Sequence, residues 1–171
     1  MPERKIIIGL TNPKSASNVG AVMRAAGCFH ANSVLYTGTR YDRSVKLNTD
    51  TKKIVGVIPL IHVEAFQPNL TEDTKIVCVD LVEGAIPLPA FKHPDNAIYI
   101  FGPEDGTIKQ QVIDKADYVV YIPTKGCLNL AATVNVVLYD RLSKSTIHST
   151  DNALIKNSRD TNNHVKVKIA K

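Results

Sequence analysis

This sequence of 171 residues is poor in cysteine and has no apolar run long enough to span a membrane. Its three cysteines, Cys28, Cys78 and Cys127, are widely spaced and form no Cys-x-x-Cys pair. We therefore expect neither a disulfide framework nor a zinc site, and no bound metal. The N-terminus has no signal-peptide pattern, and the free cysteines fit a reducing compartment, so we expect a cytoplasmic protein.

Motifs of several other protein classes are also missing. The histidines form no His-Glu-x-x-His pattern, and none is spaced to activate Cys127 as a nucleophile. No Gly-x-Gly-x-x-Gly follows the first expected strand, which argues against a dinucleotide-binding domain. A receiver domain could use Asp80 and the pair Thr124 and Lys125. It would also require an acidic pair after its first strand, where residues 9–13 read GLTNP.

Positive charge exceeds negative charge and is concentrated in two segments. The net charge is +5 and the isoelectric point about 9.1, which favours an anionic partner. Residues 40–53 contain five basic and two acidic side chains, and the tail from Asp151 contains the same numbers of each. Two solvated, flexible segments and two contact regions for a phosphate backbone are both compatible with this pattern.

The alternation of apolar runs and amphipathic segments predicts an α/β fold, with a mostly parallel sheet and helices on both faces. Strands are expected at residues 5–10, 33–37, 75–80, 97–101 and 118–122. Helices are expected at residues 18–28, with Ser17 as cap, and at 109–115 and 128–144. The last helix is apolar on most sides, which indicates packing on its own sheet and on a second subunit.

The remaining segments predict less regular structure. A short helix is expected at the end of residues 40–53, short extended pieces within 54–66, and a proline-rich loop at 83–94. Residues 1–148 would form a single domain, followed by a basic, flexible tail at 149–171.

Three segments place polar residues where a strand or loop leads into a helix. They are NVGAVMR from Asn18 to Arg24, IFGPEDGTI at residues 100–108, and IPTKGCLNLA at residues 122–131. Ligands bind at such strand ends in open α/β sheets. Each segment also has a structural explanation: a capping asparagine with a surface arginine, a tight turn, and a strand–turn–helix junction with Asn129 in the early helix.

In this order the three segments resemble the motifs of the SpoU/TrmH branch of the knotted SPOUT methyltransferases, over residues 5–144. The sequence departs from the family pattern in places. Phe29 and His30 replace a frequent Phe-Gly pair, and residues 106–108 only approximate a Gly-Leu pair. Cys127 stands where serine is common, after a shortened connection, and a thiol forms weaker hydrogen bonds than a hydroxyl.

The resemblance implies a C-terminal deep trefoil knot and a homodimer whose two active sites use residues from both chains. It also implies methyl transfer from S-adenosylmethionine to a ribose 2′-hydroxyl of RNA. The cofactor-binding residues would be Val79, Gly102, Pro103, Ile122, Gly126 and Leu128. The catalytic residues would be Arg24, Asn18, Glu104 and Asn129.

The chemistry of arginine restricts what Arg24 can do in such a reaction. A guanidinium is effectively always protonated, so it is a poor general base. We expect Arg24 to hold the phosphate beside the reacting ribose and to stabilise the developing alkoxide. Asn18 and Asn129 would orient the reactants, and Glu104 would hold an asparagine or arginine in place.

RNA would be bound by basic side chains of the central segment and of the late loop: Arg40, Arg43, Lys46 and Lys125. No added RNA-binding domain is expected before Lys5, which slightly favours tRNA over rRNA. The alternative is a non-catalytic RNA-binding module on the same fold, because Cys127 and the shortened connection depart from the family pattern.

Overall fold

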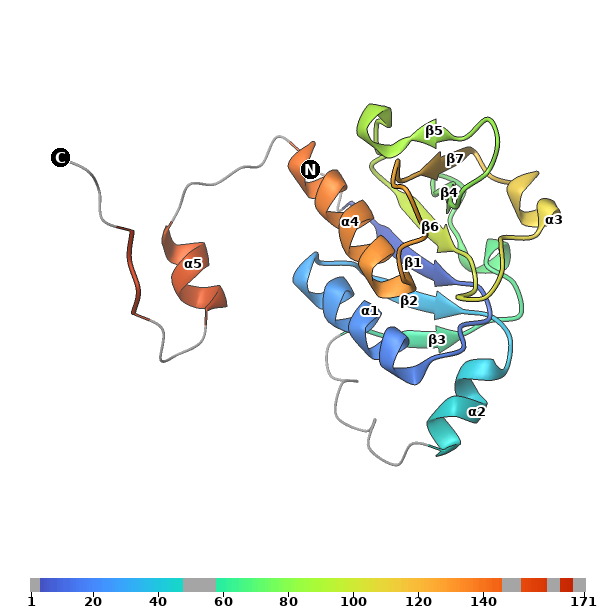
Figure 1. Cartoon of the computed structure of the whole chain (residues 1–171), viewed down its shortest axis with the longest axis horizontal. Coiled ribbons are helices and arrows are strands. Elements are labelled where there is room, and N and C mark those ends of the chain that lie inside the picture. Colours follow the sequence, from blue (N-terminus) through green and yellow to red (C-terminus); the bar gives the residue numbers. More distant parts are fainter. Residues whose placement is uncertain (1–3, 48–57, 146–151, 160–163, 168–171) are drawn as a thin grey trace.

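A single parallel sheet forms the centre of the computed structural model, which describes residues 4–47, 58–145, 152–159 and 164–167 (Figure 1). The strand order is β3-β2-β1-β6-β4-β7-β5, and each neighbouring pair runs parallel. The strands are β1 (Ile6–Leu10), β2 (Ser33–Tyr36), β3 (Leu60–His62), β4 (Lys75–Val79), β5 (Ile86–Pro87), β6 (Ala97–Phe101) and β7 (Tyr118–Tyr121). The predicted α/β fold with a parallel sheet is confirmed.

The three central strands end level with one another. Leu10 of β1 and Val79 of β4 both pair with Phe101, the last residue of β6. All five residues of β6 are buried, as a strand covered on both faces requires. The carboxyl ends of β1, β6 and β4 therefore share one edge of the sheet, where ligands of open α/β sheets bind.

Helices cover both faces of the sheet, as predicted. Helix α1 (Ala16–Cys28) and helix α4 (Leu130–Ser143) lie side by side on one face (Figure 1). On the other face, apolar residues of the sheet pack with residues near the 3₁₀ helix η1 (Gln67–Asn69) and helix α3 (Gln110–Ile113). Each fully buried aliphatic side chain in these two layers contributes about 1.5–3 kcal/mol to folding.

The start of α1 differs from the prediction by two residues. Ser15 is the N-cap: its backbone is extended, and its hydroxyl accepts a hydrogen bond from the backbone N–H of Asn18. Ser17 lies inside the first turn, where its hydroxyl is 2.8 Å from that of Ser15. The predicted cap at Ser17 was wrong because an earlier serine already satisfies the first amides of the helix.

The basic segment is helical at its start, and the helix predicted at its end lies outside the described residues. Helix α2 (Arg40–Leu47) begins directly after β2, and residues 48–53 lie outside the described part of the chain. Tyr41 packs against the main core, and Asp42 accepts a 2.7 Å hydrogen bond from the Tyr36 hydroxyl. These tertiary contacts stabilise a helix that the charge-rich sequence alone did not indicate.

Residues 83–94, predicted as a loop, are more ordered than predicted. They contain edge strand β5 and the 3₁₀ helix η2 (Leu88–Ala90), because proline is compatible with an edge strand and with a first helical turn. In the tail, Asn152–Ser158 form helix α5, whereas residues 164–167 have no regular structure. Within the described ranges, no helix has the length and apolarity needed to cross a membrane.

Candidate active site

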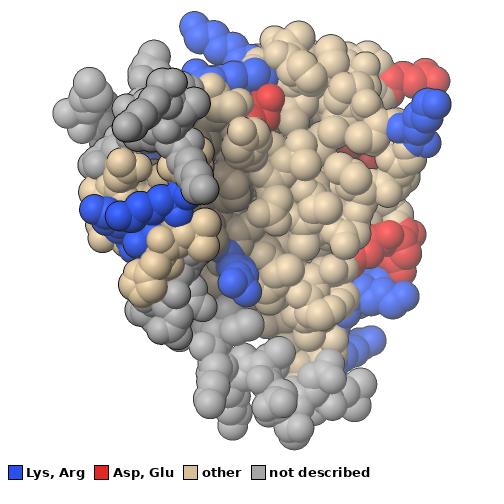
Figure 2. Space-filling model, turned by 60° about the vertical axis from the view of Figure 1, so that its left-hand side comes forward, with Lys and Arg blue, Asp and Glu red and all other residues tan. Residues whose placement is uncertain are grey.

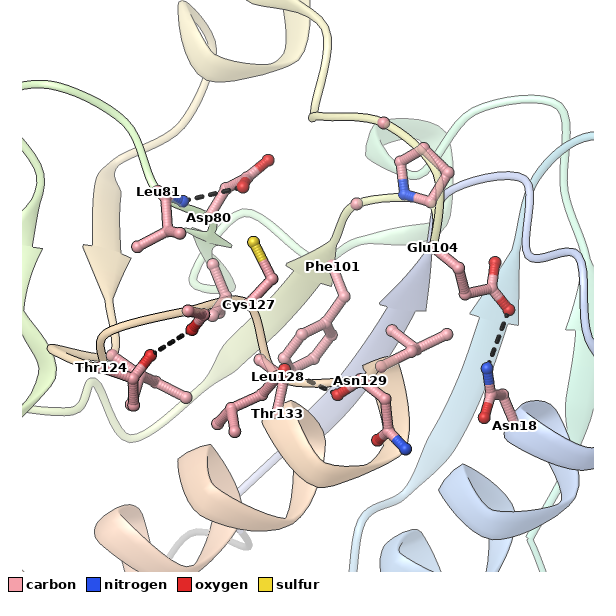
Figure 3. Close-up of a pocket in the computed structure, with 17 residues that line it drawn as sticks. Asn18, Asp80, Leu81, Phe101, Glu104, Thr124, Cys127, Leu128, Asn129 and Thr133 are labelled. Atoms are coloured by element: carbon pink, nitrogen blue, oxygen red, sulfur yellow. Dashed lines mark hydrogen bonds between the residues drawn. The ribbon is translucent and has the colours of Figure 1, made fainter.

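A cavity of about 250 Å³ lies at the carboxyl edge of the sheet, between the ends of β4, β6 and β7 and the first turns of α1 and α4 (Figure 3). Most of its wall comes from the two later predicted segments, with Asn18 from the first. The lining residues are Asn18, Val79, Asp80, Leu81, Phe101, Gly102, Pro103, Glu104, Gly106, Ile122, Thr124, Gly126, Cys127, Leu128, Asn129, Leu130 and Thr133.

Glu104 joins the loop after β6 to the start of α1. Its carboxylate accepts hydrogen bonds from the backbone N–H groups of Lys14 (2.8 Å) and Ser15 (3.1 Å). The amide Nδ2 of Asn18 donates a third, at 3.3 Å, and both side chains line the cavity (Figure 3). The carboxylate thus binds free donors at a helix N-terminus and orients Asn18.

These contacts also keep Glu104 ionised. Partial burial by itself would raise the pKa of the carboxyl, because it penalises the charged form. The hydrogen bonds from Lys14, Ser15 and Asn18 outweigh that effect, and the pKa lies below its ordinary value. Glu104 is therefore an acceptor and an anchor at neutral pH, and it has no proton to donate.

Asp80 is a second anchoring carboxylate, which the sequence analysis did not select as a site residue. Its Oδ1 accepts from the backbone N–H of Leu81 and its Oδ2 from that of Ile108, both at 2.8 Å. A β-carbon on Gly102 would lie 3.3 Å from Asp80 Oδ2 and 3.4 Å from the Ile108 nitrogen. Glycine at position 102 lets the loop pass close to this carboxylate. Its place as a polar residue at the end of the buried strand β4 could have identified Asp80 as a site residue from the sequence.

The loop between β7 and α4 forms the facing wall. The Thr124 hydroxyl donates to the carbonyl of Gly126 at 2.6 Å, which tightens the turn. Asn129 is the N-cap of α4 and not an early helical residue: its Oδ1 accepts from the Ala132 N–H at 2.7 Å. Because the cap uses the oxygen, the Nδ2 group of Asn129 is able to donate to a ligand.

The cavity suits a nucleoside-like ligand with a cationic centre. Leu81, Phe101, Ile122 and Leu128 provide apolar wall, and two carboxylates, Asp80 and Glu104, lie at its margin. Small-molecule sites typically combine such apolar walls with a few fixed polar groups. Carboxylates close to the cavity also favour a positively charged sulfonium electrostatically.

The structure brings most of the predicted site residues together. All six predicted cofactor-binding residues line the cavity, as do Asn18, Glu104 and Asn129. Arg24 does not: it lies two turns beyond the start of α1, on an exposed stripe with Ala21 and Cys28. Six helical residues rotate a side chain by about 120° and carry it about 9 Å along the axis. Within a single chain, Arg24 therefore does not line the same cavity as Asn18.

The predicted RNA-binding residues Arg40, Arg43 and Lys125 do not line the cavity. Lys125 is exposed between Thr124 and Gly126, which line the cavity. Arg43 is exposed on α2, and Lys46 belongs to the same helix, but its side chain is outside the described part of the structure. Arg40, the first residue of α2, is bonded to Asp105 in the loop after β6.

Comparison with known proteins gives the family of this fold and site. The model of the SpoU rRNA Methylase family matches residues 5–139. The 23S rRNA (guanosine-2'-O-)-methyltransferase RlmB of Acinetobacter baylyi is 23% identical over 150 residues, which cover 81% of this chain and 59% of that protein. This chain therefore spans about three fifths of the length of that relative.

Solved structures show the same fold. The SpoU methyltransferase AviRb from Streptomyces viridochromogenes, in complex with AdoMet, has a TM-score of 0.68 and 19% identity, covering 84% of this chain and 59% of that one. A structure described as "Structural insights into the 2-OH methylation of C/U34 on tRNA" has the same TM-score and identity and covers 84% and 92%. With the family match over most of its length, this chain belongs to the SpoU rRNA Methylase family.

Proposed function

We propose that this protein transfers a methyl group from S-adenosylmethionine to a ribose 2′-hydroxyl of RNA. The observation that carries the proposal is the cavity at the carboxyl edge of the sheet. It gathers the six residues predicted to bind the cofactor with Asn18, Glu104 and Asn129, in a chain of the SpoU family. The relatives RlmB and AviRb, both described as methyltransferases, support the same assignment.

The side chains at the cavity would position the reactants. S-adenosylmethionine, when bound, supplies a methyl group that is already activated on a sulfonium. Asn18, held by Glu104, and Asn129, through its Nδ2 group, would orient the ribose hydroxyl in line with that methyl. The apolar wall formed by Leu81 and Leu128 would exclude water from the reacting atoms.

Arg24 would complete the site from a second copy of the chain. It is exposed on α1, which packs beside α4, and α4 exposes Val136, Tyr139 and Leu142. Figure 2, in which the left-hand side of Figure 1 comes forward, shows a broad surface with few charged side chains. We propose a homodimer through this face, with Arg24 holding RNA phosphate at the partner's cavity. We also propose the family's deep trefoil knot for the C-terminal half.

We propose tRNA rather than rRNA as substrate. The structure concerned with C/U34 of tRNA is covered over 92% of its chain, against 59% for the rRNA enzyme RlmB. The exposed cations Arg43 and Lys125 would contact the phosphate backbone of the tRNA. A reducing cytoplasm is the proposed location, consistent with the free cysteines.

The decisive experiment is transfer of labelled methyl from S-adenosylmethionine to bulk tRNA and, separately, to rRNA. Label in tRNA that resists alkaline cleavage at a single position is the expected result, because 2′-O-methylation removes the attacking hydroxyl. Arg24→Ala should lower turnover at least about 100-fold, the scale for loss of a transition-state contact. Arg4→Ala, which changes an exposed arginine paired with Asp95 at the other end of the sheet, is the matched control.

Cys127 at a position where the family favours serine supports one other function, a non-catalytic RNA-binding module. That function predicts RNA binding without methyl transfer to either RNA pool. If methyl transfer and calorimetric binding of S-adenosylmethionine were both absent, the enzymatic proposal would be overturned and the RNA-binding module would be favoured.

A further inference from the structure

Arg40, which the sequence indicated as an RNA contact, is engaged within the chain. Its NH1 and NH2 groups donate to Oδ1 and Oδ2 of Asp105, both at 2.8 Å. The Nζ of Lys14 lies 3.8 Å from the same carboxylate. The Arg40 side chain is 28% exposed and that of Asp105 is 51% exposed, so solvent and solute can reach the pair.

The pair lies at the edge of the proposed active site. Asp105 follows Glu104, which lines the cavity and binds Asn18, and it precedes Gly106, which also lines the cavity. A ribose oriented by Asn18 would therefore place its own phosphates within the neighbourhood of Arg40. The Arg40–Asp105 pair joins the start of α2 to the loop that forms one wall of the site.

A phosphate can replace the carboxylate in this geometry. Both anions present two oxygens to the planar fork of a guanidinium, and both form parallel hydrogen bonds with it. The Arg40 hydrogen bonds hold the pKa of Asp105 below its ordinary value, so the carboxylate is charged at neutral pH. Exposed ion pairs stabilise proteins only weakly, whereas RNA phosphates also gain from the release of counterions.

We propose that Asp105 is an internal substitute for an RNA phosphate: it holds Arg40 in the free enzyme, and a substrate phosphate displaces it. This inference rests on the proposed function, since it names the RNA contact of the same site. Displacement frees Asp105 while Glu104 keeps its separate bonds to the start of α1. Arg40 is thus pre-positioned for RNA, and Asp105 limits its binding of other anions.

The test measures whether each of two substitutions strengthens or weakens binding of labelled bulk tRNA, by filter binding at a series of salt concentrations. Asp105→Asn removes the competitor and should tighten binding roughly two- to fivefold, the scale of an exposed ion pair. Arg40→Ala should weaken binding and lower the salt slope by about one phosphate contact. In the Arg40→Ala background, Asp105→Asn should increase the affinity for tRNA no more than the charge control Asp114→Asn does. Asp114→Asn removes one negative charge at the C-cap of α3, where the carboxylate accepts a hydrogen bond from Gln110.

Opposite effects of Asp105→Asn and Arg40→Ala on tRNA affinity distinguish displacement of Asp105 by phosphate from a purely structural role of the pair. If Asp105 only fixed α2 to the loop, both single variants would weaken tRNA binding and calorimetric binding of S-adenosylmethionine together. A lower affinity for tRNA in Asp105→Asn, or a gain equal to that of Asp114→Asn, would overturn the proposed exchange. Methyl transfer by the wild-type chain would still support the proposed function in that case. No methyl transfer by the wild-type chain would instead overturn the function itself.

Discussion

His30 adopts a backbone conformation that usually belongs to glycine. Its φ is +56°, and it follows Phe29 at the end of α1. The Ala31 N–H donates to the carbonyl of Ala26 at 2.9 Å, and the His30 N–H to that of Gly27 at 3.4 Å, which is the Schellman pattern of helix ends. Because a β-carbon crowds the left-handed region, His30 stores strain where the family often has glycine.

His30→Gly should therefore stabilise the protein. Relief of left-handed strain contributes about 1 kcal/mol, and the greater flexibility of glycine in the unfolded chain offsets part of it. The measurement is the urea midpoint at pH 7.5, which should rise with an unchanged m-value. His30→Ala keeps the β-carbon and is the control. An equal rise in both variants would show that loss of the imidazole, and not the backbone, is responsible.

The cysteines offer a direct test of where the cofactor binds. Cys127 is exposed and lines the cavity, Cys28 is exposed on α1, and Cys78 is buried with its pKa raised to about 12 by desolvation and by the nearby Asp80. S-adenosylmethionine should slow alkylation of Cys127 by N-ethylmaleimide and leave the rate at Cys28 unchanged. Peptide mass spectrometry measures both rates in one sample. Equal rates at Cys127 with and without cofactor would place the cofactor elsewhere.

At the scale of elements, a buried polar network ties α4 to β6. His93 is 5% exposed; its Nε2 lies 2.8 Å from Asp140 and its Nδ1 2.7 Å from the Tyr99 hydroxyl. Arg141 donates to the same hydroxyl at 2.9 Å, and Lys144 to Asp140 at 2.6 Å. These contacts assign a neutral His93 that donates from Nε2 and accepts the Tyr99 proton at Nδ1.

This network predicts a loss of stability at mildly acidic pH. Burial lowers the pKa of His93, and the hydrogen bond to Asp140 only partly offsets it. An unfolded histidine titrates near pH 6.5, so below that pH the unfolded chain binds more protons and stability falls as pH decreases. The urea midpoint should drop between pH 7.5 and 5.5, and His93→Gln should flatten that slope. His62→Gln is the control, and an unchanged slope in His93→Gln would contradict the assignment.

The elements differ in how far the sequence alone could predict them. Strands β1, β4 and β6 were predicted nearly to the residue, because continuous apolar runs indicate strands buried on both faces. Helix α2 and strand β5 were missed, because tertiary contacts such as that of Tyr36 with Asp42 outweigh their local preferences.

The sequence predicted those site residues whose positions are determined by the parallel sheet alone. Asn18, Gly102 and Asn129 were expected at strand ends, and the parallel sheet brings those ends to one edge. Asp80 was not selected, because its role depends on the loop that folds back to place the Ile108 N–H beside it. In the proposed homodimer, the position of Arg24 relative to a complete site depends on the second chain, which no local pattern describes.

At the scale of the whole molecule, the exposed face of α4 determines the proposed assembly. Tyr139 is 63% exposed, with Leu142 and Val136 also exposed nearby on the same helix. Placing a charge there should break the homodimer, because a buried unpaired carboxylate is costly. Tyr139→Glu should elute as a monomer in size exclusion with light scattering, and Ile61→Glu, on edge strand β3, should remain dimeric. A monomeric wild-type chain would contradict the proposed dimer.

A mixing experiment tests whether the two chains share active sites. Arg24→Ala and Glu104→Gln should each be inactive, because one lacks the phosphate contact and the other the anchor of Asn18. If Arg24 serves the partner's cavity, a mixed dimer of the two variants contains one site with both residues intact. Random reassociation, with half of the dimers mixed, should then restore about a quarter of wild-type methyl transfer. If Arg24 acts within its own chain, every site in the mixture lacks one group and activity stays at the level of the separate variants. Because Arg24 does not line its own chain's cavity, the proposed homodimer predicts recovery of activity in the mixture.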